Sequence, residues 1–515
     1  MLARMRTATP LPVDVRPLPT HVHVFVIGAG FAGLGMAIKL AEQGEDDFVV
    51  VERGSDVGGT WRDNTYPGAA CDVPSQLYSF SFAPNPRWSR SFSPQPEIQG
   101  YLRDLARRAG VLDRFRFGTT VEHAAWDDEA QQWRVRTSAG DLTVDVLVSA
   151  TGALSDPKLP DIDGLDSFAV EVFHSARWNH DQDLTGKRVA VIGTGASAIQ
   201  IVPEIAEQVT HLDVYQRTAP WVMPRRDRAY TAPERFAFRH LPGVQKAYRT
   251  AIYWGRECLV PAFTVNPKIA APARKAALHN IHKAITDPEL RRKVTPTFEI
   301  GCKRILISND WYPTLARDDV DLVTDPITKV TPTAVVTADG TEREVDVLIV
   351  ATGFHTTDLP IAEHIHGRDG QSLAHYFSRV GMQAYKGSTV TGFPNLFFIV
   401  GPNTGLGHSS MVFMIESQIA YTVDAVRRMR AQGLAAVEPR PEAQRRWTDD
   451  VQRRMRRTVW STGGCSSWYL DEHGRNVTLW PRTTFTFRRL TARFDPDAYL
   501  ATAAQKPGRK AGQPA

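Results

Sequence analysis

The chain has few cysteines and no long apolar run. Its four cysteines, Cys71, Cys258, Cys302 and Cys465, include no CxxC pair. This excludes a CxxC redox dithiol and suggests no disulfide framework, so we expect a reducing, cytoplasmic setting. No segment has the length and apolar content that a membrane-spanning helix needs. The first 20 residues lack a continuous apolar core, which predicts a loose tail and not a signal peptide.

Charge of one sign does not dominate either. The 515 residues include 61 Lys and Arg against 56 Asp and Glu, a net charge of +5. This modest excess favours anionic ligands only weakly, and we predict no nucleic-acid partner. A composition of 42% hydrophobic and 23% charged residues is that of a globular protein, long enough for two or three cores.

The chain is organised around a stretch near its start, where a short apolar run, Val24–Ile27, stops at a glycine turn. A helical pattern follows, which predicts a strand, a tight loop and a helix N-terminus. Gly28 permits the turn, Gly30 lets a pyrophosphate approach the backbone, and Gly33 lets the helix pack closely on the strand. Glu52 ends a second apolar strand about 20 residues further on, where an acid holds a ribose hydroxyl. The pattern predicts nucleotide binding; the alternative is an unoccupied βαβ turn.

The same pattern recurs 165 residues later, at Val189–Ile192 followed by Gly193 and Gly195. Two mononucleotide-binding folds are therefore expected in one chain. At this offset Arg217 takes the position of Glu52. An acid accepts hydrogen bonds from ribose, whereas an arginine pairs with a 2′-phosphate. The first site is predicted to bind FAD and the second NADP(H), unless Arg217 is only a surface arginine.

Two further buried strands, 144–152 and 345–353, each end in Ala-Thr-Gly and are expected to close the two nucleotide-binding units. Helical spacing between 230 and 295 predicts an insertion in the second unit, and aromatic-rich strands are expected at 478–480 and 484–487. The predicted fold class is α/β, with two Rossmann-like dinucleotide-binding domains and a helical insertion in the NADP domain. The expected segments are 20–153 and 385–503 for the FAD-binding domain, 160–223 and 301–380 for the NADP-binding domain, 224–300 for the insertion, and 1–19 and 504–515 for flexible tails.

The segment 58–72 follows the second strand and carries a more specific pattern. It resembles the GGxWxxxxYPGxxxD segment of type I Baeyer–Villiger monooxygenases, and every defined position matches. In that family the tryptophan and the aspartate lie against the flavin. The resemblance therefore implies that role for Trp61 and Asp72.

The linker between the two units is similar to the family pattern FxGxxxHxxxW, with Phe168, His174 and Trp178 at defined positions. Val170 replaces the glycine, and Asn179 replaces the Pro or Asp that follows the tryptophan. Related N- and S-oxygenases usually have another aromatic at the Trp178 position, so Trp178 favours the ketone-oxidising branch. His174 is interpreted as a structural linker residue without a chemical role.

Lys303 and Arg304 form the Lys-Arg pair that the family places ahead of paired aromatics, here Trp311 and Tyr312. The resemblance implies that Arg304 is the catalytic residue and that Lys303 helps hold the NADP 2′-phosphate. The family reaction forms a C4a-peroxyflavin from reduced flavin and O₂, and a fixed cation stabilises its anion and the oxyanion of the ketone adduct. Asp72 is expected to hold Arg304 in place and to offset its desolvation.

Positions carried over from the resemblance complete the predicted site. Met411 is expected beside the flavin ring, although a core methionine is an equal alternative, and Trp468 resembles the tryptophan of a mobile loop that closes over NADP. No metal site is predicted. The predicted FAD-binding residues are Gly28, Gly30, Phe31, Ala32, Gly33, Glu52, Arg53, Gly59, Thr60, Trp61, Asp72, Tyr78, Val121 and Met411, and the predicted NADP-binding residues are Gly193, Thr194, Gly195, Ala196, Ser197, Ala198, Arg217, Thr218, Lys303, Arg304 and Trp468.

The function predicted from these patterns is an NADPH-dependent flavoprotein monooxygenase that converts a ketone and O₂ to an ester or lactone. The first alternative is an N- or S-oxygenating flavin-containing monooxygenase, which the predicted Arg304–Asp72 pair disfavours. A nucleotide-binding regulatory protein without turnover is the alternative from another class. The substrate pocket is expected between the insertion and the segments 354–360 and 460–468.

Overall fold

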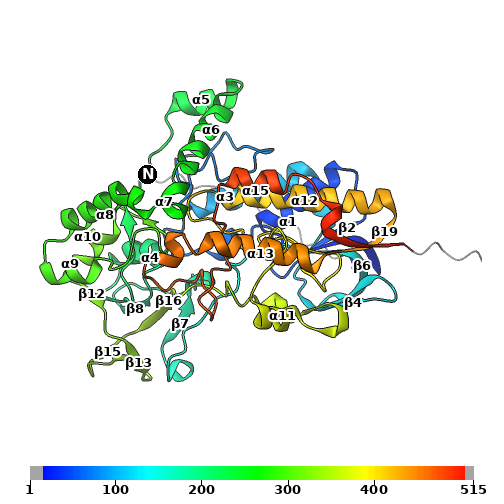
Figure 1. Cartoon of the computed structure of the whole chain (residues 1–515). Helices are drawn as coiled ribbons and strands as arrows, with labels where there is room; N and C mark the ends of the chain where they lie inside the picture. The colour runs from blue at the N-terminus through cyan, green and yellow to red at the C-terminus, as the bar shows by residue number, and fades with distance from the viewer. Residues whose placement is uncertain (1–15, 505–515) are drawn as a thin grey trace, which may run out of the picture.

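The computed structural model describes residues 16–504 (Figure 1). Two sheets with parallel cores and flanking helices form two domains, which confirms the predicted fold class. The predicted tails fall largely on residues 1–15 and 505–515, outside the described residues. Within the described part of the first tail, Leu18 packs against the core of the first domain and is not loose. Across residues 16–504 no helix combines the length and apolar content needed to cross a membrane.

The first domain is built on an eight-stranded sheet in the order β17-β4-β5-β6-β1-β2-β3, with β18 paired to β6. Its central strand β1 is buried on both faces, as the continuous apolar run requires. Helices α1 (Phe31–Glu42), α3 (Gln95–Ala109) and α12 (Met411–Gln432) share one core with it. The strands are β1 (His21–Ile27), β2 (Phe48–Glu52), β3 (Phe115–Phe117), β4 (Val121–Asp127), β5 (Gln132–Thr137), β6 (Gly140–Ser149), β17 (Ile365–His366) and β18 (Leu396–Phe398).

The second domain has a five-stranded, all-parallel sheet in the order β12-β9-β8-β16-β7. Helices α4 (Ala198–Ile205) and α10 (Trp311–Leu315) pack into its core. Its strands are β7 (Glu171–His174), β8 (Arg188–Ile192), β9 (His211–Tyr215), β12 (Val320–Val323) and β16 (Val347–Val350), with a small antiparallel sheet of β13 (Ile327–Val330), β14 (Ala334–Thr337) and β15 (Glu342–Glu344) and a parallel pair of β10 (Val222–Met223) and β11 (Leu306–Ile307).

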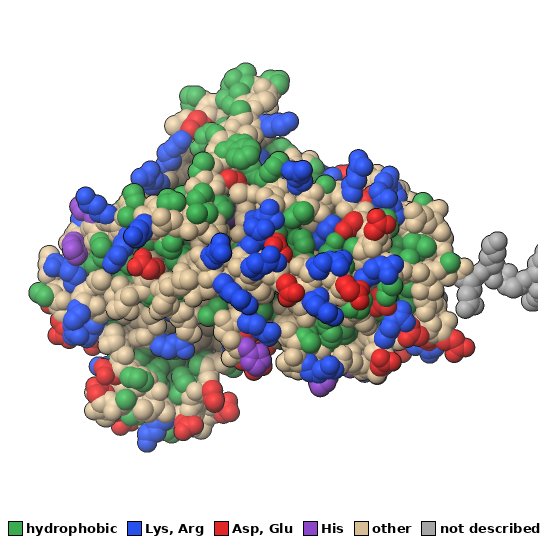
Figure 2. Space-filling view, viewed as in Figure 1, with side chains coloured by type: hydrophobic (Ala, Val, Ile, Leu, Met, Phe, Trp, Pro, Cys, Tyr) green, Lys and Arg blue, Asp and Glu red, His purple; other side chains and the backbone are tan. Residues whose placement is uncertain are grey.

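The predicted insertion is helical. It comprises α5 (Ala232–His240), α6 (Val244–Glu257), α7 (Val260–Thr264), α8 (Ala271–Ala284) and α9 (Pro288–Val294). Thr231 and Glu234 form a capping box that starts α5. Helices α5 and α6 project from the body of the protein, and the projection carries exposed hydrophobic side chains (Figures 1 and 2). Phe236 and Trp254 are each more than half exposed.

One domain boundary was placed too late. The NADP-binding segment was expected to run to residue 380, but β17 pairs with β4 of the first sheet. Helix α11 (Leu373–Val380) then buries Leu373 and Phe377 in the core of the first domain. The chain therefore returns to the first domain before Ile365. The sequence did not show this return, because strand pairing across some 240 residues leaves no local pattern.

The prediction of aromatic-rich strands near the C-terminus is wrong. Residues 484–487 begin a helix, α15 (Thr484–Leu490), and 478–480 form no strand. The Thr483 hydroxyl caps α15 by accepting a hydrogen bond from the Thr486 amide, which overrides the strand preference of Thr and Phe. The remaining elements are α2 (Thr60–Asp63), α13 (Pro441–Met455), α14 (Val459–Thr462) and the antiparallel pair β19 (Leu434–Pro439) and β20 (Tyr499–Ala503).

The expectation that the chain has no disulfide is also wrong. Cys302 and Cys465 are bonded, with 6.1 Å between their Cα atoms and 163 residues between them in sequence. Cys71 is buried and free, and Cys258 is exposed and free. Sequence spacing does not report pairing over such a separation. The bridge links the segment before Lys303 to the loop that carries Trp468.

Candidate functional site

The first glycine loop is closed tightly by its own backbone. Gly28 has a φ of +102°, and a Cβ on it would lie 2.8 Å from the Ala150 carbonyl oxygen. A Cβ on Gly33 would lie 1.8 Å from the Gly28 carbonyl oxygen, so α1 packs on β1 only with glycine there. The predicted roles of these two glycines in the turn and in close packing therefore match the geometry.

Gly30 and Gly59 together form a backbone surface at the N-terminus of α1, where Phe31 and Ala32 begin the helix. A Cβ on Gly59 would lie 3.1 Å from the Gly30 Cα, so either side chain would fill the space between them. Glu52 lies at this loop, where Oε2 accepts a hydrogen bond from the Ala29 amide (2.9 Å). Exposed amides at a helix N-terminus suit a pyrophosphate, and this chain's residues therefore fit the adenine dinucleotide half of FAD.

Aromatic side chains line the next part of the predicted FAD site. Trp61 donates from Nε1 to the Tyr78 hydroxyl (2.9 Å), and the Phe31 ring lies 5.2 Å from the Tyr78 ring. Burial raises the pKa of Tyr78 above its ordinary value, so the phenol stays neutral. These three residues, distant in sequence, form one aromatic cluster beside α1.

Four other predicted FAD residues make contacts of their own within the protein. Val121 begins β4 and is buried in a core that it shares with residues of β5 and α11. Met411 begins α12 and packs against a small core that includes Met414 and Trp480. Arg53 pairs with Asp156 (2.5 Å), and the Thr60 hydroxyl donates to the Leu154 carbonyl (3.4 Å). Their contacts with FAD stay predictions.

The second glycine loop is more open. Gly193 has a φ of +116°, and its Cβ would lie 2.5 Å from the Ala351 carbonyl oxygen, but a Cβ on Gly195 would meet nothing within 4 Å. Ala196 and Ser197 extend the loop before α4 begins at Ala198. The Thr194 hydroxyl donates to the Thr218 carbonyl (3.3 Å), which fixes the loop beside Arg217.

Arg217 and Lys303 bring two cations together. Burial lowers the pKa of Lys303, and the positive charge of Arg217 lowers it further. Neither side chain pairs with a carboxylate among residues 16–504. The Lys303 ammonium lies 5.3 Å from the Phe298 ring centre. Two adjacent cations without a carboxylate suit a phosphate dianion, and the predicted 2′-phosphate site fits this geometry.

Arg304 and Asp72 form a bidentate ion pair between residues 232 positions apart. Arg304 donates from Nε to Asp72 Oδ2 (2.9 Å) and from Nη2 to Oδ1 (2.7 Å) and Oδ2 (2.6 Å). Burial raises the pKa of Asp72, but the Arg304 charge and hydrogen bonds outweigh it, so the pKa is lowered. Asp72 in turn raises the pKa of Arg304. Both groups are therefore charged at physiological pH.

The segment that carries Asp72 packs against the second domain. Tyr66 donates to Gln200 Oε1 on α4 (3.1 Å), and Gln200 Nε2 donates to the Ala70 carbonyl (3.0 Å). A Cβ on Gly68 would lie 2.8 Å from the Gln200 carbonyl oxygen. Asp72 is therefore held at the boundary of the two domains. Gln200 gave no signal in the sequence, because its role depends on a contact between segments 130 residues apart.

The loop that carries Trp468 lies close to Arg304. The Trp468 carbonyl accepts a hydrogen bond from the Thr356 hydroxyl (3.1 Å), and its side chain is 42% exposed. Tyr469 is buried near Arg304, and burial raises its pKa to about 12. The Cys302–Cys465 bridge ties this loop directly to the residue before Lys303. Tyr469 and the bridge were both missed by the sequence interpretation.

The linker motif makes contacts within the protein that fit a structural role. Burial lowers the pKa of His174 to about 4, so the imidazole is neutral, and its Nδ1 accepts from the Ala176 amide (3.1 Å). The Trp178 ring packs edge-on against Phe173 at 5.0 Å. Asn179 donates to Glu171 Oε1 (2.7 Å), which fixes the position where the family pattern has Pro or Asp. These contacts agree with a structural interpretation of His174.

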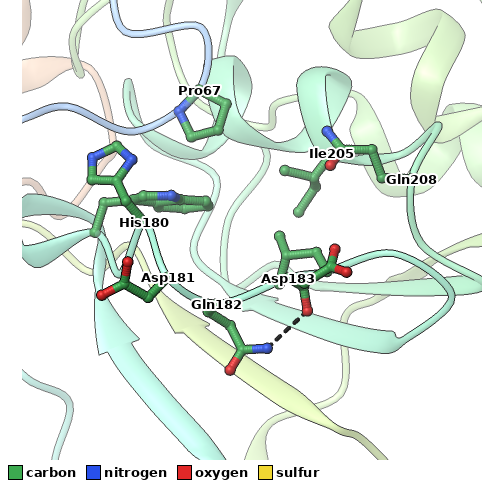
Figure 3. A pocket seen from close by; sticks show the side chains of 9 residues that line it. Pro67, His180, Asp181, Gln182, Asp183, Ile205 and Gln208 are labelled. Atoms are coloured by element: carbon green, nitrogen blue, oxygen red, sulfur yellow. Dashed lines mark hydrogen bonds between the residues drawn. The ribbon is translucent and has the colours of Figure 1, made fainter.

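A surface pocket beside this linker contains none of the predicted site residues (Figure 3). It is lined by Pro67, His180 and the acidic stretch 181–183, and Gln182 donates to the Asp183 carbonyl (2.8 Å). Acidic lining disfavours a nucleotide phosphate there.

Elsewhere in the described chain, His211, Asp213 and Asp321 are close enough to share a cation, but Arg343 already lies 3.4 Å from Asp213.

Two dinucleotide folds, with an arginine–aspartate pair between them, define a flavin- and nicotinamide-dependent oxidoreductase. The model of the pyridine nucleotide-disulphide oxidoreductase family matches residues 25–233. A Baeyer–Villiger monooxygenase from Streptomyces coelicolor is 54% identical over 95% of this chain and 94% of its own length. One from Pseudomonas aeruginosa is 50% identical over 92% and 90%. The chain belongs to the Baeyer–Villiger monooxygenase family.

Solved structures agree with this assignment. Cyclohexanone monooxygenase from Rhodococcus sp. Phi1 bound to NADP⁺ is 30% identical, with a TM-score of 0.83 over 95% of this chain and 100% of its own. The OTEMO complex with FAD and NADP is 28% identical, with a TM-score of 0.84 over 93% and 99%. The predicted family resemblance and two-domain architecture are thereby confirmed.

Proposed function

We propose that this chain converts a ketone to an ester or lactone, using NADPH and O₂, with FAD in the first domain and NADP in the second. The observation that carries the proposal is the bidentate Arg304–Asp72 pair at the boundary between two nucleotide-binding loops. When bound, FAD would take hydride from NADPH and activate O₂, which is the source of the inserted oxygen atom. The chain's own residues hold the cofactors, orient the ketone and stabilise charge.

Arg304 has the properties that this role needs. Its pKa is raised by Asp72, so it stays cationic at any working pH, and its orientation is fixed by three hydrogen bonds. A fixed cation stabilises negative charge that develops on a carbonyl oxygen without reorganisation during the reaction. Its Nη1 atom makes none of these three hydrogen bonds, which leaves a donor for the substrate.

The ketone class is supported by the relatives. One cyclohexanone monooxygenase structure with a TM-score of 0.80 has ε-caprolactone bound. An N- or S-oxygenase is the second candidate, but such chemistry has no need of a cation held by a partly buried carboxylate. We also propose a cytoplasmic location, although the Cys302–Cys465 bridge removes the argument from missing disulfides.

The test is the Arg304→Ala variant, assayed for two separate steps. NADPH should still bleach the flavin absorbance under anaerobic conditions, because the two nucleotide loops are intact. Ester or lactone formation from a cyclic ketone should fall by at least about a hundredfold, as for the loss of one essential oxyanion donor. Arg239→Ala, an exposed change on α5, is the matched control. Normal ester yield from Arg304→Ala would refute the role of Arg304.

A further inference from the structure

Arg256 is a cation of the helical insertion for which the proposed reaction gives no role. It lies near the C-terminal end of α6, and its side chain is partly buried. Within residues 16–504 its guanidinium makes no hydrogen bond and no ion pair. The other partly buried arginines of the insertion do have partners: for example, Arg225 lies 3.9 Å from Asp227, and Arg291 donates to the Ile285 carbonyl (2.7 Å).

The face of α6 that carries Arg256 packs on the FAD-binding domain. Arg249, two turns earlier, donates to the Gln76 carbonyl (2.7 Å). The Tyr253 ring stacks on Phe413 of α12, with 5.0 Å between ring centres. Residues seven and three positions apart share one helix face, so the Arg256 side chain leaves α6 on the side of these contacts.

The segment after Arg256 contacts both α15, which packs on α12, and the segment that carries Arg304. Glu257 accepts hydrogen bonds from the amide (3.0 Å) and the hydroxyl (2.7 Å) of Thr484. Phe263 on α7 packs against Gly301, where a Cβ would lie 2.8 Å from its ring. Gly301 is three residues before Arg304. Arg256 is therefore held between contacts to α12, which follows the glycine-rich loop 405–407, and contacts to the segment that carries Arg304.

The same face of α6 contacts Gln76, four residues after Asp72, and the charges of Arg256 and Asp72 act on each other. Burial lowers the pKa of Arg256, and the negative charge of Asp72 opposes this change. The charge of Arg256 in turn helps to lower the pKa of Asp72. Asp72 already forms a bidentate pair with Arg304 and so does not serve Arg256 as a hydrogen-bond partner. A partly buried guanidinium without a hydrogen-bonded anion is costly unless a ligand supplies one.

We propose that Arg256 binds an anionic oxygen group of the ketone, so that this enzyme prefers ketones that also carry a carboxylate. The proposal rests on the proposed ketone oxidation at Arg304 and names the substrate class for that site. The planar guanidinium matches a carboxylate with two parallel hydrogen bonds. The 2′-phosphate of NADP is served by Arg217 and Lys303, which leaves Arg256 for the substrate.

The experiment uses the FAD-loaded enzyme and a series of linear methyl ketones that end in a carboxylate, with each methyl ester as the neutral partner. The quantity compared is the ratio of kcat/KM for acid over ester at each chain length. The wild type should favour the acid at one or two lengths by roughly tenfold to a hundredfold, the value of a hydrogen-bonded charge. Arg256→Met should bring the ratio near one, Arg256→Lys should restore part of it, and Arg239→Met should leave it unchanged.

The outcomes separate this proposal from the proposed function. New ester groups formed by oxygen insertion into the neutral ketones show that the oxidation itself is correct, whatever the acid preference. A wild type with no preference for any acid would overturn the role of Arg256. Equal losses with acids and esters in Arg256→Met, at unchanged FAD content, would also overturn it and indicate a structural role.

Discussion

The two glycine loops share one sequence pattern but differ in how tightly they are closed. In the first, α1 begins at Phe31, and Gly33 leaves no space for a Cβ against Gly28. In the second, the position equivalent to Gly33 is Ala198, and α4 begins only there. The second helix therefore carries a Cβ at the position where the first helix has no space for one. A tightly closed loop suits a cofactor that stays bound, and an open loop suits one that exchanges.

The largest effect is expected from a substitution that disrupts the first glycine loop. Gly33→Ala places a Cβ 1.8 Å from the Gly28 carbonyl oxygen, so α1 must move and the FAD site is lost. The purified variant should contain almost no FAD by its ratio of flavin to protein absorbance. Gly195→Ala in the second loop meets nothing within 4 Å and should keep its FAD. A Gly33→Ala protein with full FAD content would show that the first loop is not closed as described.

The second effect concerns which nucleotide the open loop selects. Removing both unpaired cations, in Arg217→Ala with Lys303→Ala, should lower kcat/KM for NADPH by about tenfold to a hundredfold and leave NADH nearly unaffected. FAD content should not change, because the first loop is untouched. Lys275→Ala on α8 is the control for loss of a surface cation. An equal loss with both nucleotides would separate these residues from 2′-phosphate recognition.

The sequence predicted features that depend on one local segment, and it did not predict contacts between residues far apart in the chain. Gly28, Gly33 and Glu52 lie in one local pattern of strand, turn and helix, so the sequence predicted their positions. The repeat of this pattern also showed that Arg217 takes the position of Glu52 in the second unit. The family motifs supplied Asp72 and Arg304. The Cys302–Cys465 bridge, the pairing of β17 with β4 and the Gln200 contact join residues far apart, and no local pattern marks them. At α15 the N-cap at Thr483 stabilises a helix, although the aromatic residues of this segment favour a strand.

The third prediction tests the ion pair that joins the two halves. The pKa of Asp72 is lowered on folding, so its contribution to stability is present above the unfolded pKa and is lost as pH falls through the folded one. Asp72→Asn should lower the free energy of unfolding at neutral pH by about 1–3 kcal/mol, because Arg304 loses its partner but stays partly solvated. The gap between wild type and variant should close below about pH 4, as chemical denaturation at several pH values would show. A gap that does not change with pH would mean that Asp72 is not ionised in the folded protein.

The smallest expected effect concerns the loop that carries Trp468, which is predicted to close over NADP. The Cys302–Cys465 bridge fixes the Trp468 loop beside Lys303, so breaking it adds conformational freedom that NADP binding must remove. Cys465→Ser should raise KM for NADPH several-fold, with kcat at saturating NADPH and FAD content unchanged. Wild type treated with dithiothreitol should behave in the same way, whereas Cys258→Ser, at an exposed free thiol, should not. If KM is the same with and without the bridge, then the hydrogen bond from Thr356 and the burial of Tyr469 are enough to hold the loop, and the second site is less open than its glycine geometry indicates.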